Sequence, residues 1–323
     1  MPKQPAKRKM GRYGWVPDLP DARDYLYSAP AIALAALPPS TDLRSGCPPV
    51  YDQGRIGSCT ANAIGAAFEF TLKKLNLGDF MPSRLFIYYN ERAMEGHVQF
   101  DSGAQIRDGV KSVATLGVCP ETDWPYDDTP ATSDGGPFPP GAPDGEQPPP
   151  KCYQEALNNR ATTYRRVTPS LDQMRGCLAA GYPFVFGFTV YESFESQEVA
   201  KTGVAPMPQP NEQVLGGHAV LAVGYDDASQ TFLVRNSWGT GWGQAGYFTL
   251  PYAYLTTRGL ASDFWTLRIV TCPPLPSRAA RRRMGRPRGE GRVGVSGGLR
   301  ACVEHVGGPV VAVYSVDDDD VAV

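Results

Sequence analysis

The chain has 323 residues, of which 42% are apolar, 20% charged and 11% aromatic, as in a folded globular protein. No run approaches the roughly 20 apolar residues that cross a bilayer, which excludes a membrane-spanning protein. The net charge of -2 combines basic ends with an acidic body, residues 13–276, which holds 18 basic and 27 acidic side chains. This charge distribution does not resemble that of a nucleic-acid-binding domain.

The N-terminal region, residues 1–40, has five Lys or Arg among its first twelve residues and continues through Trp15-Val-Pro-Asp-Leu-Pro20. Its prolines and small residues predict an extended arm rather than a packed domain. The apolar run at 31–38 is too short for a signal-peptide core and lacks a basic segment directly before it. We therefore expect a cytoplasmic protein, or one exported by a route without a standard signal peptide.

Three helices are predicted after the arm, over residues 59–77, 83–94 and 103–116. In the first helix, apolar residues recur at spacings of four, four and three, which places them on one face: Ile64, Phe68, Leu72 and Leu75. Residues 127–150 then contain eight prolines and few large apolar side chains. This composition predicts a surface loop or insertion.

The second half of the chain has a different pattern. Short β-type segments separated by Gly and Asp turns follow at residues 184–190, 219–223, 231–235 and 247–250. A helical first half and a β-rich second half predict an α+β protein with two lobes. Residues 273–323 form an Arg/Gly-rich and then acidic tail that we expect to be flexible. Its basic part, 278–292, either binds polyanions or is simply solvated.

Cys59 follows Gln53-Gly-Arg-Ile-Gly-Ser and begins the first predicted helix. Unpaired backbone N–H groups and the helix dipole favour an anion at a helix start. This lowers the pKa of a thiol and populates the thiolate, which is the nucleophile. A buried structural cysteine at a helix start fits the same residues.

His218 has the surroundings of a general base. Two glycines precede it and an apolar strand follows, which holds the imidazole rigidly and leaves one face open. Asn236 ends a later strand, and its side-chain carbonyl is suited to orient an imidazole, as the third member of a triad does. Trp238 is placed to cover the pair. The alternative for Asn236-Ser-Trp-Gly-Thr-Gly-Trp242 is a Gly-rich hairpin with two structural tryptophans.

Three blocks resemble the signature motifs of papain-family cysteine peptidases and occur in that family's order: Gln53…Gly-Ser-Cys59, Gly-His218-Ala-Val-Leu-Ala-Val-Gly-Tyr225 and Asn236-Ser-Trp-Gly-Thr-Gly-Trp242. The resemblance covers roughly residues 37–270. It implies a papain-like two-lobed α+β fold, with a helical left lobe, a β-barrel-like right lobe and the active-site cleft between them. The implied catalytic domain is 41–272, with the helical lobe at about 51–155 and the β-rich lobe at about 156–272.

The resemblance implies a role for each of four residues. Cys59 is the nucleophile that forms a thioester, and His218 is its base. Asn236 orients His218, and Gln53 joins the Cys59 backbone N–H in an oxyanion hole. The implied activity is that of a cysteine endopeptidase acting on peptides or proteins, with no cofactor and no metal site. The alternatives are a transpeptidase or amidase with the same acyl-enzyme, and an inactive relative that binds peptides.

The substrate pocket implied by the resemblance is lined by small residues and one acid. Its residues are Gly103, Gly187, Ala219, Trp238 and Asp263. The small residues favour a bulky apolar side chain next to the cleaved residue, whereas an inward-pointing Asp263 favours Arg or Lys. The sequence leaves both open.

The chain also departs from the family pattern. Thr60 follows the nucleophile where most of the family has Trp, and Gly217 precedes His218 where many relatives have Asp or Asn. Ile56 and Asp101 stand where the family usually has paired cysteines, which suits a reducing compartment. With 58 residues before Cys59, we expect no long helical propeptide of the kind common in the family. Residues 1–40 are therefore either a short inhibitory arm across the cleft or a disordered N-terminus.

Overall fold

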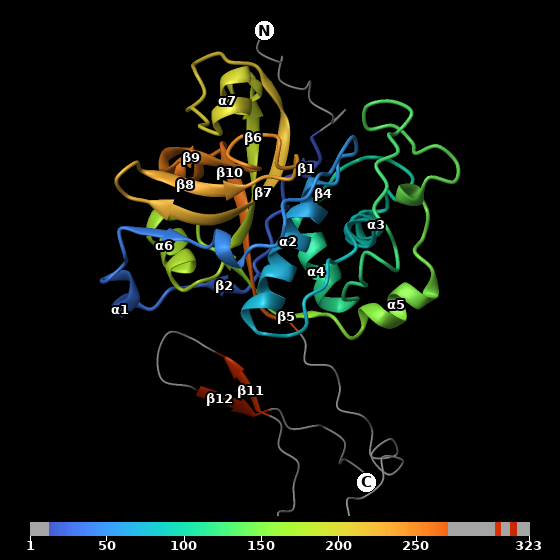
Figure 1. The fold of residues 1–323 in the computed structure, drawn as a ribbon, viewed down its shortest axis with the longest axis horizontal. Coiled ribbons are helices and arrows are strands. Elements are labelled where there is room, and N and C mark those ends of the chain that lie inside the picture. The colour runs from blue at the N-terminus through green and yellow to red at the C-terminus, as the bar shows by residue number, and fades with distance from the viewer. Residues whose placement is uncertain (1–12, 271–300, 305–310, 315–323) are drawn as a thin grey trace, which may run out of the picture. The chain divides into compact units, whose positions relative to one another are not determined.

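The structure, a computed structural model, describes residues 13–270, 301–304 and 311–314 (Figure 1). The chain divides after Cys272 into two compact units. In the second unit, strands β11 (Ala301–Glu304) and β12 (Val311–Tyr314) pair in an antiparallel hairpin. The basic run 278–292, for which we considered polyanion binding, lies outside the described residues, as does most of the tail.

The helices of the first unit include the three that the sequence predicted. They are α2 (Cys59–Lys74), α3 (Arg84–Glu95) and α4 (Ile106–Thr115), followed by α5 (Pro150–Ala156). Helix α2 is buried along most of its length because it lies between the sheet and helices α3 and α4 (Figure 1). Helix α3 begins where the Ser83 side chain accepts the Phe86 N–H, and it ends at Gly96 in the left-handed conformation. No helix in the described residues is long and apolar enough to cross a membrane.

An open eight-stranded sheet forms the other half of the unit. Its strand order is β2-β5-β10-β6-β7-β8-β9, with β3 paired to β7. The strands are β2 (Leu26–Tyr27), β3 (Ser40–Asp42), β5 (Ala161–Val167), β6 (Phe184–Tyr191), β7 (Val214–Asp226), β8 (Thr231–Arg235), β9 (Tyr247–Pro251) and β10 (Ala261–Val270). All four predicted strands are present, and β7 is longer than expected because it already begins at Val214.

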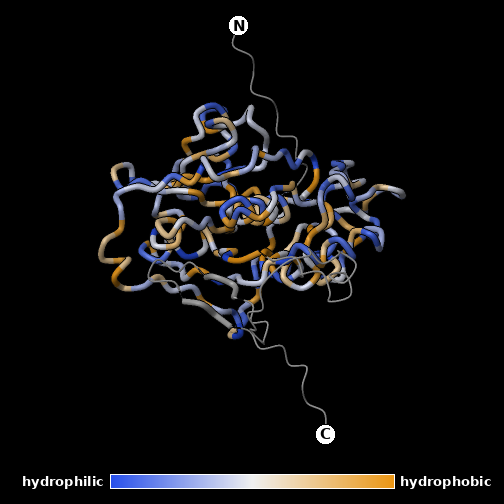
Figure 2. The backbone as a smooth tube through the Cα atoms, turned by 60° about the horizontal axis from the view of Figure 1, so that its bottom comes forward, coloured by the Kyte–Doolittle hydropathy of each residue, from blue (hydrophilic) through white to orange (hydrophobic). Residues whose placement is uncertain are grey.

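The sheet separates two hydrophobic clusters. Along β6 the side chains alternate, so that Phe184, Phe186 and Phe188 enter one cluster while Val185 enters the cluster around α2. Helices α6 (Leu171–Ala179), α7 (Gln197–Thr202) and α8 (Tyr252–Thr256) contribute to the phenylalanine-rich side. Figure 2 shows hydrophobic segments running through the middle of the fold.

The N-terminal region is packed against the body. Strand β1 (Trp15–Val16) pairs in parallel with β4 (Ala104–Gln105), and β2 extends the main sheet at its edge beside β5. Helix α1 (Ala31–Leu34) follows. The sequence predicts an extended arm rather than a packed domain, and residues 13–40 form short elements that bury the rings of Tyr13, Trp15 and Tyr27 against the body.

The proline-rich insertion is fastened to the helical side of the unit. Phe138 and Asp144 are buried, and the fully buried Arg92 of α3 donates to the Asp144 carbonyl. The same guanidinium lies over the Phe138 ring, with Cζ 4.9 Å from the ring centroid. Within the insertion, a short 3-10 helix spans Pro143–Gly145. The segment is therefore irregular in backbone but anchored by specific contacts.

Candidate active site

Cys59 and His218 come from different elements that meet in one place. Cys59 is the first residue of α2, and His218 lies in β7 directly before Ala219. The backbone N–H of Ala219 lies 3.4 Å from the Cys59 sulfur. Both side chains are fully buried. The helix start and the middle of β7 thus bring a thiol and an imidazole into the same site.

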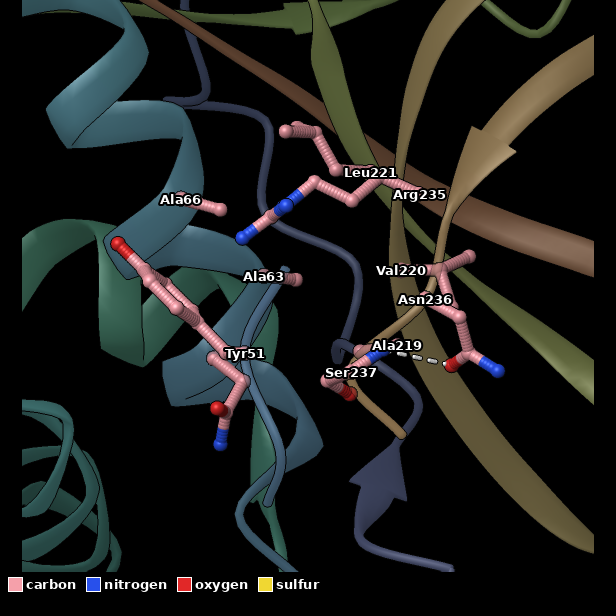
Figure 3. A pocket seen from close by; sticks show the side chains of 10 residues that line it. Tyr51, Ala63, Ala66, Ala219, Val220, Leu221, Arg235, Asn236 and Ser237 are labelled. Atoms are coloured by element: carbon pink, nitrogen blue, oxygen red, sulfur yellow. Dashed lines mark hydrogen bonds between the residues drawn. The ribbon is translucent and has the colours of Figure 1, made fainter. Parts of the chain in front are cut away.

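Asn236 fixes the orientation of the histidine ring. The Nε2 atom of His218 lies 2.9 Å from Asn236 Oδ1, which also accepts the Ser237 backbone N–H at 2.8 Å. Because an amide oxygen only accepts, Nε2 carries the proton and Nδ1 is the basic nitrogen. Figure 3 shows Asn236 and Ser237 at the end of β8, beside a small cavity between α2 and the β7–β8 hairpin.

Aromatic rings enclose the imidazole. Trp238 is stacked on His218, with ring centroids 5.0 Å apart and an interplanar angle of 25°. Phe188, on the neighbouring strand β6, meets the His218 ring edge-on, with ring centroids 5.8 Å apart. Together they exclude water from the ring and restrict its rotation.

Gln53 lies next to this group and is also fully buried. Its backbone N–H donates to the Ser237 carbonyl at 2.8 Å, and Ser237 Oγ donates to Gln53 Oε1 at 2.6 Å. With Oε1 engaged, Nε2 points to the loop that leads into Cys59 and donates to the Ile56 carbonyl at 3.1 Å. The amide thus has a defined orientation beside the loop that leads into Cys59.

The thiol itself does not match the sequence-based expectation. Burial raises the pKa of Cys59 to about 12, although the N–H groups of Ala219 and Gly14 act in the opposite direction. In this covered site the neutral thiol is therefore favoured over the thiolate that the sequence predicts at the helix start. The physical reason is that the sulfur is out of contact with water, and desolvation disfavours its charged form more than nearby N–H groups favour it.

The N-terminal arm is part of the covering over the sulfur. The Gly14 N–H is directed at Cys59, and the Gly14 carbonyl accepts the Ala104 N–H at 2.8 Å. The contact is so close that a Cβ on Gly14 would lie 1.6 Å from the Gly57 carbonyl oxygen, and one on Gly103 would lie 2.2 Å from the Gly14 oxygen. The backbone at Gly14 thus lies directly over the Cys59 sulfur, between Gly57 and Gly103.

Trp15 occupies the pocket that the sequence analysis outlined. A Cβ on Gly187 would lie 2.0 Å from the indole, and one on Gly217 would lie 2.6 Å from it. The indole N–H donates to Asp263 Oδ2 at 3.2 Å. Ala219 lies opposite Gly187 in the β6–β7 register. Of the predicted pocket residues, Gly187 and Asp263 therefore meet at Trp15, whereas Gly103 lies against Gly14 and Trp238 stacks on His218.

A buried carboxylate fastens the arm just beyond Trp15. Asp18 accepts the Arg107 backbone N–H at 3.0 Å and the Trp265 indole N–H at 2.9 Å. Its own N–H donates to Asp263 at 2.8 Å. Burial and the neighbouring charge of Asp263 raise the pKa of Asp18 to about 6.

Two arginines of the body complete this attachment. Arg107 pairs with Asp24 at 2.6 Å, and Arg166 lies 2.9 Å from both Asp24 and Asp263. Their guanidinium groups lower the pKa of Asp24 against the effect of its burial. The arm is thus bound by charged groups as well as by the rings of Tyr13 and Trp15.

Comparison with known proteins identifies the family. Residues 37–264 match the family described as papain family cysteine protease, which is more than half of the chain. The chain belongs to the papain family of cysteine proteases. It is therefore a hydrolase of the cysteine-peptidase type, with a papain-like α+β fold.

Several relatives of this papain-family chain are similar over most of its length. The crystal structure of xylellain, a cysteine protease from Xylella fastidiosa, is 51% identical, covers 81% of this chain and 98% of its own, and superposes with a TM-score of 0.76. An uncharacterised peptidase C1-like protein of Acanthamoeba polyphaga mimivirus is 46% identical over 231 residues, 69% of this chain and 70% of that protein. Cysteine proteinase 3 of Entamoeba histolytica is 28% identical over 238 residues, 72% of this chain and 68% of that protein.

At two positions that depart from the family pattern, the side chain makes a specific hydrogen bond. Thr60, at the position where the family pattern led us to expect Trp, is buried and donates to Glu91, a carboxyl whose pKa burial raises well above its usual range. Asp101, at a usual cysteine position, accepts the Gly57 N–H at 2.9 Å. Five cysteines of the described chain are free thiols: Cys47, Cys59, Cys119, Cys152 and Cys177.

Two residues near Cys59 are not predicted as part of the site from the sequence. The sequence places Trp15 only in an extended arm, although large aromatic side chains such as Tyr13 and Trp15 in a proline-rich segment are a signal of buried anchors. The sequence marks Asp101 only as the replacement of a cysteine. Nothing local marks that aspartate as a partner of the nucleophile loop, since the two lie 44 residues apart in sequence.

Proposed function

We propose that the protein is an endopeptidase that cleaves peptide bonds through a thioester on Cys59. The observation that carries this proposal is the contact of 2.9 Å between His218 Nε2 and Asn236 Oδ1, made beside the Cys59 sulfur. It leaves His218 Nδ1 as the base for the thiol. A transpeptidase that passes the same thioester to an amine is the second candidate.

The steps follow from these roles. His218 Nδ1 takes the thiol proton, and the Cys59 sulfur attacks the scissile carbonyl carbon. The Cys59 backbone N–H and Gln53 Nε2 stabilise the oxyanion. As the C–N bond breaks, His218 returns the proton to the leaving amine. Water then attacks the thioester, with His218 as the base again, and releases the carboxylic acid and the thiol.

We also propose that the arm keeps the enzyme latent. The Gly14 N–H faces the sulfur, in the place that the electrophilic carbonyl carbon of a substrate has to take. The leaving, C-terminal part of a substrate departs on the side of His218, but the arm puts its N-terminal Tyr13 there, 5.7 Å from the imidazole. The arm therefore runs in the direction opposite to a cleavable peptide, which explains how it lies in the site uncut.

The contacts of Trp15 also support a substrate preference. Arg166 lies 2.9 Å from Asp263 and neutralises it, while the glycine-lined wall makes room for a large flat ring. We propose that this pocket selects a bulky aromatic side chain next to the cleaved residue, rather than Arg or Lys.

Labelling with a thiol-directed epoxide tests the proposed nucleophile. The full chain carrying Gly14→Ala, which displaces the arm, is treated with the epoxide beside the same chain with Cys59→Ala or Cys177→Ala. We expect loss of labelling and of peptide hydrolysis in the Cys59 variant alone. Hydrolysis that persists without Cys59 would overturn the proposal. Product analysis with an added amine separates hydrolysis from transpeptidation.

A further inference from the structure

A chain of buried hydrogen bonds connects the two loops on the helical side of the site. One loop, residues 53–58, carries Gln53 and leads into Cys59. The other, residues 102–105, includes Gly103 and β4, to which the arm is bonded. Asp101 and Tyr88 lie between these loops and are both buried.

The carboxylate of Asp101 holds the first loop. The Gly57 N–H lies 2.9 Å from Asp101 Oδ1 and 3.1 Å from Oδ2. Gly57 shares a planar peptide unit with Ile56, whose carbonyl accepts Gln53 Nε2 at 3.1 Å. Because N–H and C=O point in opposite directions in a trans peptide, fixing the N–H on Asp101 also fixes the carbonyl that orients the Gln53 amide.

The hydroxyl of Tyr88 connects this carboxylate to the second loop. It donates to Asp101 Oδ1 at 2.5 Å and accepts the Gly103 N–H at 3.2 Å. Burial and the Asp101 charge raise the pKa of Tyr88 well above its usual range, so the hydroxyl keeps its proton. The Tyr88 hydroxyl thus joins the first loop, which carries Gln53, to the second loop, which contains Gly103 and lies against the Gly14 backbone.

Arg92 keeps the segment before Asp101 in place. This fully buried side chain donates to the Val98 carbonyl at 2.8 Å and to the Phe100 carbonyl at 3.0 Å. Its guanidinium also lies 4.0 Å from the centroid of the Tyr88 ring. Asp101 is therefore held from two sides, which suits a fixed hydrogen-bond acceptor rather than a mobile surface acid.

We propose that Asp101, supported by Tyr88, is a positioning residue that sets the Gln53 amide in the oxyanion hole through the Ile56–Gly57 peptide unit. The inference rests on the proposed hydrolysis by Cys59. It assigns to Asp101 no contact with the substrate. Its action is on the transition state, because Gln53 stabilises the charge that develops on the scissile carbonyl oxygen.

A double-mutant cycle tests the coupling between Asp101 and Gln53 in the full chain with Gly14→Ala. We expect Asp101→Ala to lower kcat about 10- to 100-fold with little change in KM. In a Gln53→Ala background the same substitution should lower kcat less than about threefold, since the amide it positions is gone. Asp101→Asn, which keeps an acceptor oxygen, should recover most of the loss. Tyr153→Phe, which removes a half-buried tyrosine hydroxyl elsewhere on the helical side, is the control.

A second measurement does not depend on catalysis. Hydrogen exchange of the Gly57 amide should be faster in Asp101→Ala and in the conservative Tyr88→Phe than in the parent chain. Equal kcat losses with and without Gln53, or an unchanged Gly57 exchange rate, would overturn the inference. A parent chain that exchanges slowly at Gly57 but hydrolyses no peptide would contradict the proposed function instead.

Discussion

Gln53 is oriented by its neighbours. Ser237 occupies its Oε1 and Ile56 takes one Nε2 proton, so the second Nε2 proton is available to a developing oxyanion. We expect Gln53→Ala to lower kcat about 100- to 1,000-fold, or about 2.7–4 kcal/mol of transition-state stabilisation, with KM nearly unchanged. Steady-state kinetics on the arm-displaced chain measures both constants. The exposed Gln197→Ala serves as control, and an unchanged kcat would contradict this role.

The charges of two residues, Asp263 and Arg166, should decide which substrate side chain the pocket around Trp15 prefers. With Arg166 beside it, Asp263 should gain little from a basic substrate, so peptides with Trp or Phe at the pocket position should have higher kcat/KM than those with Arg or Lys. Arg166→Ala leaves the Asp263 charge uncompensated and should raise kcat/KM for the basic peptides about tenfold relative to the aromatic ones. Paired peptides that differ only at this position give the ratio. If Arg166→Ala does not change the ratio of kcat/KM between basic and aromatic peptides, Asp263 does not face the substrate.

Site residues could be predicted from the sequence when a short local motif marks them. They could not be predicted when their role depends on a partner far away in the sequence. Gln53 and Cys59 share one short motif, and His218 and Asn236 each stand in a distinctive local pattern. Trp15 and Asp263 are 248 residues apart, and their contact depends on how the arm crosses the sheet. The pKa of Cys59 could not be foreseen either, because it depends on which segment covers the sulfur.

At the scale of elements, strand β1 is the part of the arm that closes the site. Gly14 next to it leaves no room for a side chain, since its Cβ would lie 1.6 Å from the Gly57 oxygen. We expect Gly14→Ala to displace the arm and raise kcat/KM at least about tenfold. Gly78→Ala adds the same methyl where it meets nothing within 4 Å, and it should change nothing. Equal activity of the two variants would contradict latency.

Docking of the arm should depend on pH. Asp18 has a pKa of about 6 when docked, against 3.8 for a free aspartate, so the docked state prefers the protonated acid. Docking is then strongest at acidic pH and weakens as the pH rises through 6, by about tenfold between pH 5 and 7. The ratio of kcat/KM for the full chain to that for the Gly14→Ala chain removes the pH dependence of catalysis itself. It should rise over this range, and a fall would contradict the assignment to Asp18.

The regular elements were the most predictable part of the fold. Helices α2, α3 and α4 carry clear apolar periodicity or caps, and β6 to β9 are apolar runs between turns. Strands β1 and β2 have two residues each, too few for any periodicity. They exist because tertiary partners, β4 and β5, offer unpaired edges. Strand β7 begins early, at Val214, because its first residues pair with β6 in spite of the two glycines before His218.

At the scale of the whole first unit, the arm has two parts with different roles. Residues 13–18 fill the cleft, whereas β2 and the segment after it belong to the body. Tyr27 is buried at the sheet edge, with the Arg268 guanidinium 4.6 Å from its ring centroid. Under the proposed latency, only the first part has to leave for the site to open. The exposed turn at 19–23, where Asp21 pairs with Arg23, separates the two.

Two deletions distinguish these parts by stability. Removing residues 1–23 should open the cleft and leave the sheet intact. Removing 1–36 also strips β2 from β5, exposes the surface that Tyr27 covers and breaks the Asp24 pairs with Arg107 and Arg166. Lost burial of one large side chain costs about 1.5–3 kcal/mol. At about 2–4 °C per kcal/mol, we expect the longer deletion to melt about 5–10 °C below the shorter one in calorimetry. Equal melting temperatures would mean that residues 24–36 are dispensable to the body.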